Sequence, residues 1–200
     1  LVEERNRVTS LFGQHVSPSV VDKLLAEGAT PGSKVRAVSV LFLDIRGFTS
    51  YAEQRSPDEV VGYLNKLWGP LIGEVNRHGG IINKFLGDGF LATFDLAERD
   101  RQAVCVDALA AARQLLDYFP RFNAERRAAG KQTLEFGVAL HLGEVLYGNI
   151  GASERLDFTV VGSTVNEASR IEGMCRPLQR RVLVSESFRA AASACGGSLI

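Results

Sequence analysis

The amino-acid sequence predicts an α+β fold, a ferredoxin-like β-α-β-β-α-β sandwich. Three observations predict it. An almost continuously apolar segment precedes an amphipathic helix, two short apolar segments flank a glycine turn, and a long helix precedes a strand of alternating apolar residues. This order of elements is typical of a split β-α-β sandwich. With 200 residues, of which 46% are hydrophobic, the chain is long enough for one domain with a sizeable core.

Residues 1–30 differ in pattern from the rest of the chain. Ser17-Pro18 is a typical helix start and Gly28 a typical helix end. We expect residues 1–30 to form a helical linker to an upstream element and residues 31–200 to form the main domain. Because the sequence starts at Leu1 rather than Met, we also expect it to be a piece of a longer protein.

The first half of the main domain combines a strand, a helix and a hairpin. Val35–Leu43 is nearly all apolar, as in a strand covered on both faces. Ser56-Pro57 starts a helix whose apolar residues keep a 3.6-residue spacing up to His78-Gly79-Gly80. Ile81–Leu86 and Phe90–Phe94 flank a glycine turn, which predicts a hairpin.

The second half repeats the alternation of helix and strand. A long helix is expected over residues 104–119, and residues 136–142 alternate between apolar and other residues as in a strand. A shorter helix near residues 164–174 and a strand at Val182–Val184 follow. These elements complete the predicted sandwich.

Composition excludes several classes of protein. Basic and acidic residues number 23 each, so no net charge favours nucleic acid or an anionic membrane. No apolar run approaches the ~20 residues of a membrane span, and no signal peptide opens the chain. Cys105, Cys175 and Cys195 lack CxxC spacing, which is typical of reduced, intracellular cysteines. We therefore expect a cytoplasmic domain that binds neither nucleic acid nor membrane.

Two aspartates stand where apolar segments end. Asp44 closes the run before it, and Asp88 lies in the glycine turn of the predicted hairpin. A carboxylate at such a place is costly to bury unless a cation or hydrogen-bond donors compensate. Oxygen ligands next to a flexible glycine turn favour a site for a hard metal. The alternative is a pair of ordinary turn aspartates.

Asn166 and Arg170 lie four residues apart on the predicted helix that starts near Thr164. That spacing puts both side chains on one face, where the planar guanidinium matches a phosphate. The segment Val161–Thr164 also leads into the N-terminus of this helix, and helix N-termini favour anions. It lacks the Gly-Lys-Ser/Thr ending of a Walker loop. The alternative is a solvated polar face.

Lys84 interrupts an apolar stretch, either as a side chain that reaches solvent or as a donor in a pocket. Arg99, taken alone, is one charge at a solvated helix start, and Glu144 is expected to be exposed. No Ser/His/Asp arrangement is present in the sequence pattern.

Taken together, four segments resemble the catalytic domain of class III nucleotidyl cyclases. They occur in the order of that family and span about residues 35–185. The segments are Leu41-Phe42-Leu43-Asp44-Ile45-Arg46-Gly47-Phe48-Thr49, Asn83-Lys84-Phe85-Leu86-Gly87-Asp88-Gly89, Gly143-Glu144-Val145-Leu146-Tyr147-Gly148-Asn149-Ile150-Gly151 and Val161-Gly162-Ser163-Thr164-Val165-Asn166-Glu167-Ala168-Ser169-Arg170.

The resemblance implies a ferredoxin-like core that works as a head-to-tail homodimer with active sites shared between subunits. It implies that Asp44 and Asp88 hold two divalent cations, with the backbone carbonyl of Ile45 as a further ligand. Mg²⁺ or Mn²⁺ is expected, with Ca²⁺ as an alternative at one site. Residues 31–200 would then form the cyclase domain, and residues 1–30 would couple it to an upstream sensor.

The resemblance also implies how ATP is bound and converted to 3′,5′-cyclic AMP. Lys84 corresponds to the purine-recognising lysine of adenylyl cyclases, and Thr159 to its partner, which is Thr in the bacterial subclass IIIb. Asn166 and Arg170 correspond to the pair that orients the ribose and stabilises the transition state. Arg99 lies near the position of a phosphate-binding arginine.

The sequence also allows other interpretations. They are a guanylyl cyclase, a cyclase-like regulatory module that binds nucleotide without turnover, and a polymerase-palm or diguanylate cyclase enzyme, which would need a GGDEF-type signature. Subclass IIIb includes bicarbonate-stimulated cyclases, which predicts a bicarbonate response. The residue that binds the terminal phosphate is expected beyond Ile200.

Overall fold

The computed structural model describes residues 32–152 and 155–193. A mixed sheet with the strand order β2-β3-β1-β4-β5 forms its centre, and β6 (Val182–Val184) lies parallel to β4. The other neighbours are antiparallel: β1 (Gly32–Arg46) lies between β3 (Gly89–Asp95) and β4 (Glu135–Ala152). One edge is β2 (Ile81–Phe85), and at the other edge β5 (Arg155–Val161) and β6 pair with different parts of β4. The order β2-β3-β1-β4 confirms the ferredoxin-like prediction.

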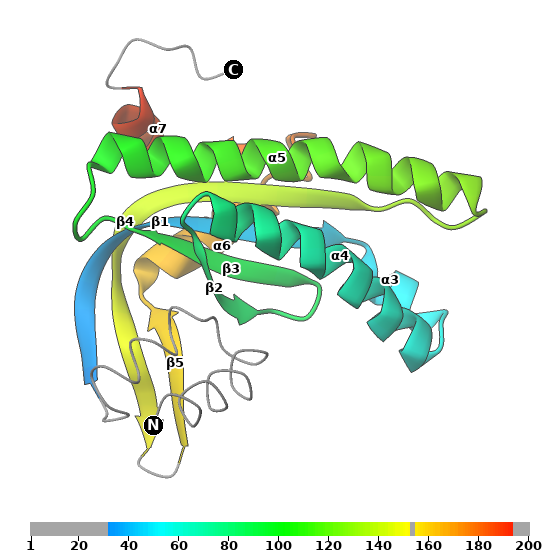
Figure 1. The fold of residues 1–200 in the computed structure, drawn as a ribbon, viewed down its shortest axis with the longest axis horizontal. Coiled ribbons are helices and arrows are strands. Elements are labelled where there is room, and N and C mark those ends of the chain that lie inside the picture. Colours follow the sequence, from blue (N-terminus) through cyan, green and yellow to red (C-terminus); the bar gives the residue numbers. More distant parts are fainter. Residues whose placement is uncertain (1–31, 153–154, 194–200) are drawn as a thin grey trace, which may run out of the picture.

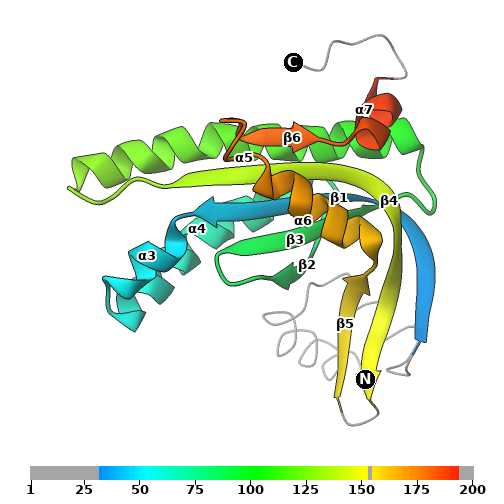
Figure 2. The ribbon, with the colours of Figure 1, turned by 180° about the vertical axis from the view of Figure 1, so that it is seen from behind.

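Helices cover both faces of this sheet (Figures 1 and 2). The long helices α4 (Pro57–Arg77) and α5 (Arg101–Ala128) lie on one face, and α6 (Ser163–Gly173) lies on the other. The short helix α7 (Glu186–Ala192) packs beside α5, and α3 (Phe48–Glu53) follows β1 directly. No helix in residues 32–152 and 155–193 is both long enough and apolar enough to cross a lipid bilayer.

Local sequence signals explain where the long helices begin. The Ser56 hydroxyl accepts a hydrogen bond from the Glu59 backbone N–H, and the Glu59 carboxylate accepts one from the Ser56 N–H, 3.1 Å away. This capping box satisfies backbone donors that the first helical turn leaves unpaired. At the start of α5, the Asp100 carboxylate accepts from the Ala103 N–H at 2.9 Å.

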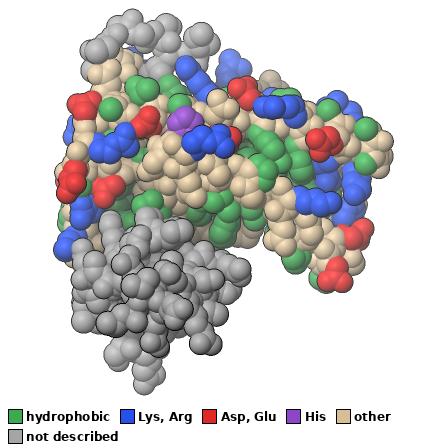
Figure 3. All heavy atoms as spheres, in the orientation of Figure 1, with side chains coloured by type: hydrophobic (Ala, Val, Ile, Leu, Met, Phe, Trp, Pro, Cys, Tyr) green, Lys and Arg blue, Asp and Glu red, His purple; other side chains and the backbone are tan. Residues whose placement is uncertain are grey.

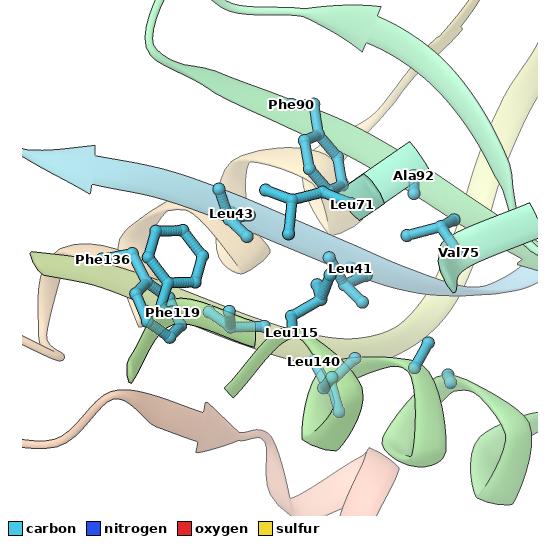
Figure 4. Packing of buried hydrophobic residues seen from close by; sticks show 14 of the residues in the cluster. Leu41, Leu43, Leu71, Val75, Phe90, Ala92, Leu115, Phe119, Phe136 and Leu140 are labelled. Carbon is cyan, nitrogen blue, oxygen red and sulfur yellow. The ribbon is translucent and has the colours of Figure 1, made fainter. Parts of the chain in front are cut away.

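The main core lies between the sheet and helices α4 and α5 (Figure 4). Its fully buried side chains include Leu41 and Leu43 from β1, and Phe119 stacks on Phe136 with ring centroids 3.7 Å apart. A smaller cluster lies on the α6 face and contains Val38 and Val40. Strand β1 is therefore buried on both faces, as its continuous apolar sequence indicates.

The sheet curls strongly at one end. The outer halves of β1 and β4 bend away from the helices together with β5, and this bend brings β5 near β2, the opposite edge of the sheet (Figures 1 and 2). On the curled part, Val35, Leu146 and Val161 lie next to one another on neighbouring strands and are 63%, 41% and 40% exposed. On the face shown in Figure 3, basic and acidic side chains are interspersed.

Several elements extend beyond the sequence prediction. The first strand runs over residues 32–46, and β4 continues to residue 152, whereas the sequence predicted a strand over residues 136–142. Strand β5 and the short helices α3 and α7 have no counterpart in the prediction. The helix expected near residues 17–28 lies outside the described residues.

Candidate active site

Asp44 lies near the end of β1 between two glycines. Its cross-strand neighbours are Gly89 on β3 and Gly137 on β4. A Cβ atom at Gly89 would overlap the Leu43 carbonyl and lie 3.1 Å from Asp44 Oδ1. Glycine is therefore needed at position 89 for β3 to lie this close to the backbone of β1.

Asp88 is tied to the same place by its backbone. It lies in the turn between β2 and β3, where Gly87 has a φ of 78°, and its carbonyl accepts a hydrogen bond from the Ile45 N–H at 3.1 Å. This hydrogen bond therefore ties the turn to the residue that follows Asp44. The structure brings together the two aspartates that the sequence singled out, and the side chain of Ile45 itself is buried in the main core.

The environment of Asp44 disfavours its negative charge. Burial, followed by the negative charges of Asp88 and Glu172, raises the pKa of the Asp44 carboxyl from 3.8 to about 7. Desolvation and nearby like charges both stabilise the protonated form of a carboxyl group. A group with so strongly shifted a pKa is a candidate functional residue.

Glu172 is a third acidic side chain at this place, and sequence reasoning missed it. It is only 9% exposed, and its carboxylate occupies the space that a Cβ atom at Gly137 would fill. Burial raises its pKa, the nearby Arg46 lowers it and Asp88 raises it. Its position in the sequence could have revealed it. The buried stripe of α6 consists of residues four apart, which are Thr164, Ala168 and Glu172.

Asn166 and Arg170 lie on another side of α6. Both are exposed, and their four-residue spacing places them on one face, as the sequence predicted. At 100° per residue, Arg170 points about 160° away from Glu172, which faces the sheet beside Asp44. Within one chain, therefore, Arg170 points away from the place where Asp44 and Glu172 lie.

The start of α6 is fastened to β4. The Thr164 hydroxyl donates to the Glu144 carbonyl at 2.5 Å, and a Cβ atom at Gly143 would lie 2.6 Å from the same hydroxyl oxygen. The glycine is therefore needed for this close contact. The Glu144 side chain is exposed, as expected.

Lys84 and Thr159 come from opposite edges of the sheet. Lys84 is exposed on β2, and Thr159 is half-buried on β5, opposite Gly148 of β4. Because the curled sheet brings β5 near β2, the two strands that carry these residues approach each other.

Arg99 lies apart from the other candidates. It precedes α5, at the end of β3 that is remote from Asp88, and it forms an ion pair with Asp107. Its guanidinium also lies beside Gly79, at the end of α4. In the structure, therefore, Arg99 is paired with α5 through Asp107 and lies beside the end of α4.

The two aspartates suit a hard divalent cation because they offer only oxygen donors and carry like charges that a cation would offset. Among the described residues, no group of three or more His, Cys, Asp and Glu side chains is arranged as a complete metal site.

Comparison with known proteins shows the family of this chain. Residues 31–196 match the family described as adenylate and guanylate cyclase catalytic domain. The uncharacterized protein Mb1352c of Mycobacterium bovis is 37% identical over 194 residues, which cover 96% of this chain and 34% of that protein. This chain thus spans about a third of the length of the curated relatives that it matches.

Two solved structures give the same result. The guanylyl cyclase Cya2 superimposes with a TM-score of 0.71 at 34% identity, over 81% of each chain. The adenylyl cyclase CyaB from P. aeruginosa gives a TM-score of 0.73 at 25% identity, over 82% of this chain and 84% of its own. The chain therefore belongs to the adenylate and guanylate cyclase family and is a class III cyclase catalytic domain.

Proposed function

We propose that this domain is an adenylyl cyclase that converts ATP into 3′,5′-cyclic AMP and pyrophosphate at sites shared by two copies of the chain. The observation that carries the proposal is the division of the candidate residues. Asp44 and Asp88 form one half-site, and Asn166 and Arg170 point away from it on α6.

A second copy of the chain would bring the two groups of residues together in one site. In a head-to-tail pair, each chain would supply the aspartates of one site and the α6 residues of the other. The exposed apolar row of Val35, Leu146 and Val161, which crosses β1, β4 and β5, is a suitable surface for contact between the copies.

Asp44 and Asp88, with the Ile45 carbonyl, would hold two divalent cations, Mg²⁺ or Mn²⁺, with Ca²⁺ as an alternative at one of them. Such ions lower the pKa of a bound hydroxyl and offset the charge on phosphates. Burial, together with the charges of Asp88 and Glu172, raises the pKa of Asp44, and a bound cation would offset this penalty on the negative charge.

The reaction is the attack of the ribose 3′-oxygen on the α-phosphorus. The P–O bond to pyrophosphate breaks as the new P–O bond forms, and the 3′-hydroxyl proton is released to solvent. Arg170 of the second chain would stabilise the charge that develops on the phosphoryl oxygens, and Asn166 would orient the ribose. Positioning and charge thus account for most of the catalysis.

Hydrogen-bond chemistry favours adenine. The ammonium group of Lys84 donates to N1, which is an acceptor in adenine and carries a hydrogen in guanine. Thr159 accepts from the 6-amino group of adenine, although its hydroxyl can also donate to the 6-oxo group of guanine. Lys84 therefore carries most of the preference for ATP.

A guanylyl cyclase is the second candidate, because the guanylyl cyclase Cya2 shares 34% identity with this chain. The test measures cyclic nucleotide from ATP and from GTP with Mn²⁺ or Mg²⁺, across protein concentration. We expect cyclic AMP to dominate, to rise faster than linearly with protein and to disappear in Asp44→Ala. Predominant cyclic GMP would establish the second candidate, and no product from either nucleotide would contradict both.

A further inference from the structure

Strand β2 carries an irregularity next to Lys84. Ile81 and Ile82 pair with Thr93 and Ala92 of β3, but Lys84 pairs with Leu91, so that Asn83 is an extra residue without its own partner. Such a β-bulge places the side chains of two successive residues on one face and shifts the alternation of the strand beyond it.

This shift determines on which face of the sheet the Lys84 side chain lies. Its partner Leu91 belongs to the cluster on the α6 face, whereas the next residue, Phe85, faces α4 and contacts the ring of Trp68 with centroids 5.6 Å apart. In a regular ladder continued from Ile82, Lys84 would lie opposite the buried Phe90 and point at α4. The bulge therefore keeps the ammonium group out of the main core.

The side chain of Asn83 holds this bulge. The hydroxyl of Thr93, which is 2% exposed, donates to Asn83 Oδ1 at 2.8 Å. The Nδ2 group of Asn83 is buried, and it has no hydrogen-bond partner among the described residues. The bond to Thr93 is thus the hydrogen bond that fixes this side chain in the described part of the protein.

We propose that Asn83 is a positioning residue for nucleotide selection, which acts by holding the bulge that directs Lys84 toward the base. The inference rests on the proposed role of Lys84 in adenine recognition. Asn83 itself needs no contact with the nucleotide, because its effect passes through the backbone that it shares with Lys84.

The test uses Asn83→Leu and Thr93→Val, which each remove the hydrogen bond, and Thr93→Ser, which keeps the hydroxyl. Steady-state KM and kcat are measured for ATP and GTP with Mn²⁺. For the first two variants we expect the KM for ATP and the ATP preference to worsen about 5–10-fold, the factor that one neutral hydrogen bond supports, with a smaller change in kcat. Thr93→Ser should resemble the wild type.

A merely structural role would lower kcat for both nucleotides alike, so the ratio between them separates the two roles. Combination with Lys84→Ala gives a second criterion. If Asn83 acts through Lys84, Asn83→Leu will not change the ATP/GTP ratio further in the Lys84→Ala background. Thr93→Val, which is nearly isosteric, keeps the test valid if Asn83→Leu does not fold.

The outcomes separate this inference from the function on which it rests. If Lys84→Ala lowers the ATP preference while Asn83→Leu and Thr93→Val leave it unchanged, the role of Asn83 is refuted and the adenylyl cyclase assignment stands. If Lys84→Ala leaves the preference unchanged, adenine recognition by Lys84 is refuted, and the inference fails with it. Binding of 3′-deoxy-ATP and 3′-deoxy-GTP, which cannot cyclise, provides the same ratios independently of turnover.

Discussion

Replacing Asp44 by Asn should make the metal-free protein more stable while it abolishes activity. The pKa of Asp44 is raised from 3.8 to about 7, mainly by burial, so folding works against the charged form. Because the folded-state pKa lies above the unfolded-state value of 3.8, the contribution of Asp44 to stability is greatest below pH 3.8. That contribution is lost as the pH rises through about 7. At pH 8 the wild type therefore carries the whole cost, which the neutral amide avoids.

The size of this effect follows from the pKa. A rise from 3.8 to about 7 corresponds to about 4 kcal/mol, at about 1.4 kcal/mol per pH unit. Because Asp44 keeps partial contact with solvent, screening reduces this to about 2 kcal/mol. For a chain of 200 residues, we expect the melting temperature of Asp44→Asn at pH 8 to rise by about 4–8 °C.

The assay is thermal unfolding with chelator at pH 8 and at pH 5, followed by circular dichroism. At pH 5 the folded carboxyl is largely protonated, so the difference should fall to less than half. Asp117→Asn, an exposed position on α5, is the matched control and should leave the melting temperature unchanged. Excess Mn²⁺ should stabilise the wild type more than the variant. An Asp44→Asn protein that melts at or below the wild-type temperature at pH 8 would show that folding does not penalise the charge of Asp44.

Two further predictions concern the base site and the space beside Asp44. Lys84→Glu combined with Thr159→Cys should raise the GTP/ATP activity ratio, because a carboxylate accepts from guanine N1; an unchanged ratio in a competition assay contradicts this assignment. Gly137→Ala should destabilise the protein by about 1–3 kcal/mol, because the new methyl group overlaps the Glu172 carboxylate. Gly173→Ala, which meets no atom within 4 Å, is the control in the same melting experiment, and equal melting temperatures for the two variants would contradict the overlap.

The sequence predicted the core of the fold because its signals there are local. The capping box at Ser56, the glycine turn around Asp88 and the two-sided burial of β1 are each encoded within a few residues. Strand β5 and the long extension of β4 are different. They depend on pairing between Leu146–Ala152 and Arg155–Val161, and the glycines of this stretch indicate a turn when they are read alone.

The candidate site shows the same difference between local signals and contacts of distant segments. Asp44, Asp88 and the pair on α6 stand out by position and spacing in the chain. The contact of Glu172 with Gly137 and the bulge at Asn83 arise only when distant strands and helices pack together. Arg99 was a candidate by resemblance alone, and the structure surrounds it with Asp107 and Gly79 rather than with the other candidate residues.

We expect each active site to combine Asp44 of one chain with Arg170 of another. The most direct measurement mixes Asp44→Ala with Arg170→Ala and assays cyclic AMP formation. Each variant alone should lose about 10²–10³ in rate or more. Half of the dimers in an equal mixture contain one intact site, so we expect recovery to about a quarter of wild-type activity at equal total protein. A mixture no more active than its components, under conditions where the two variants exchange subunits, would contradict the shared site.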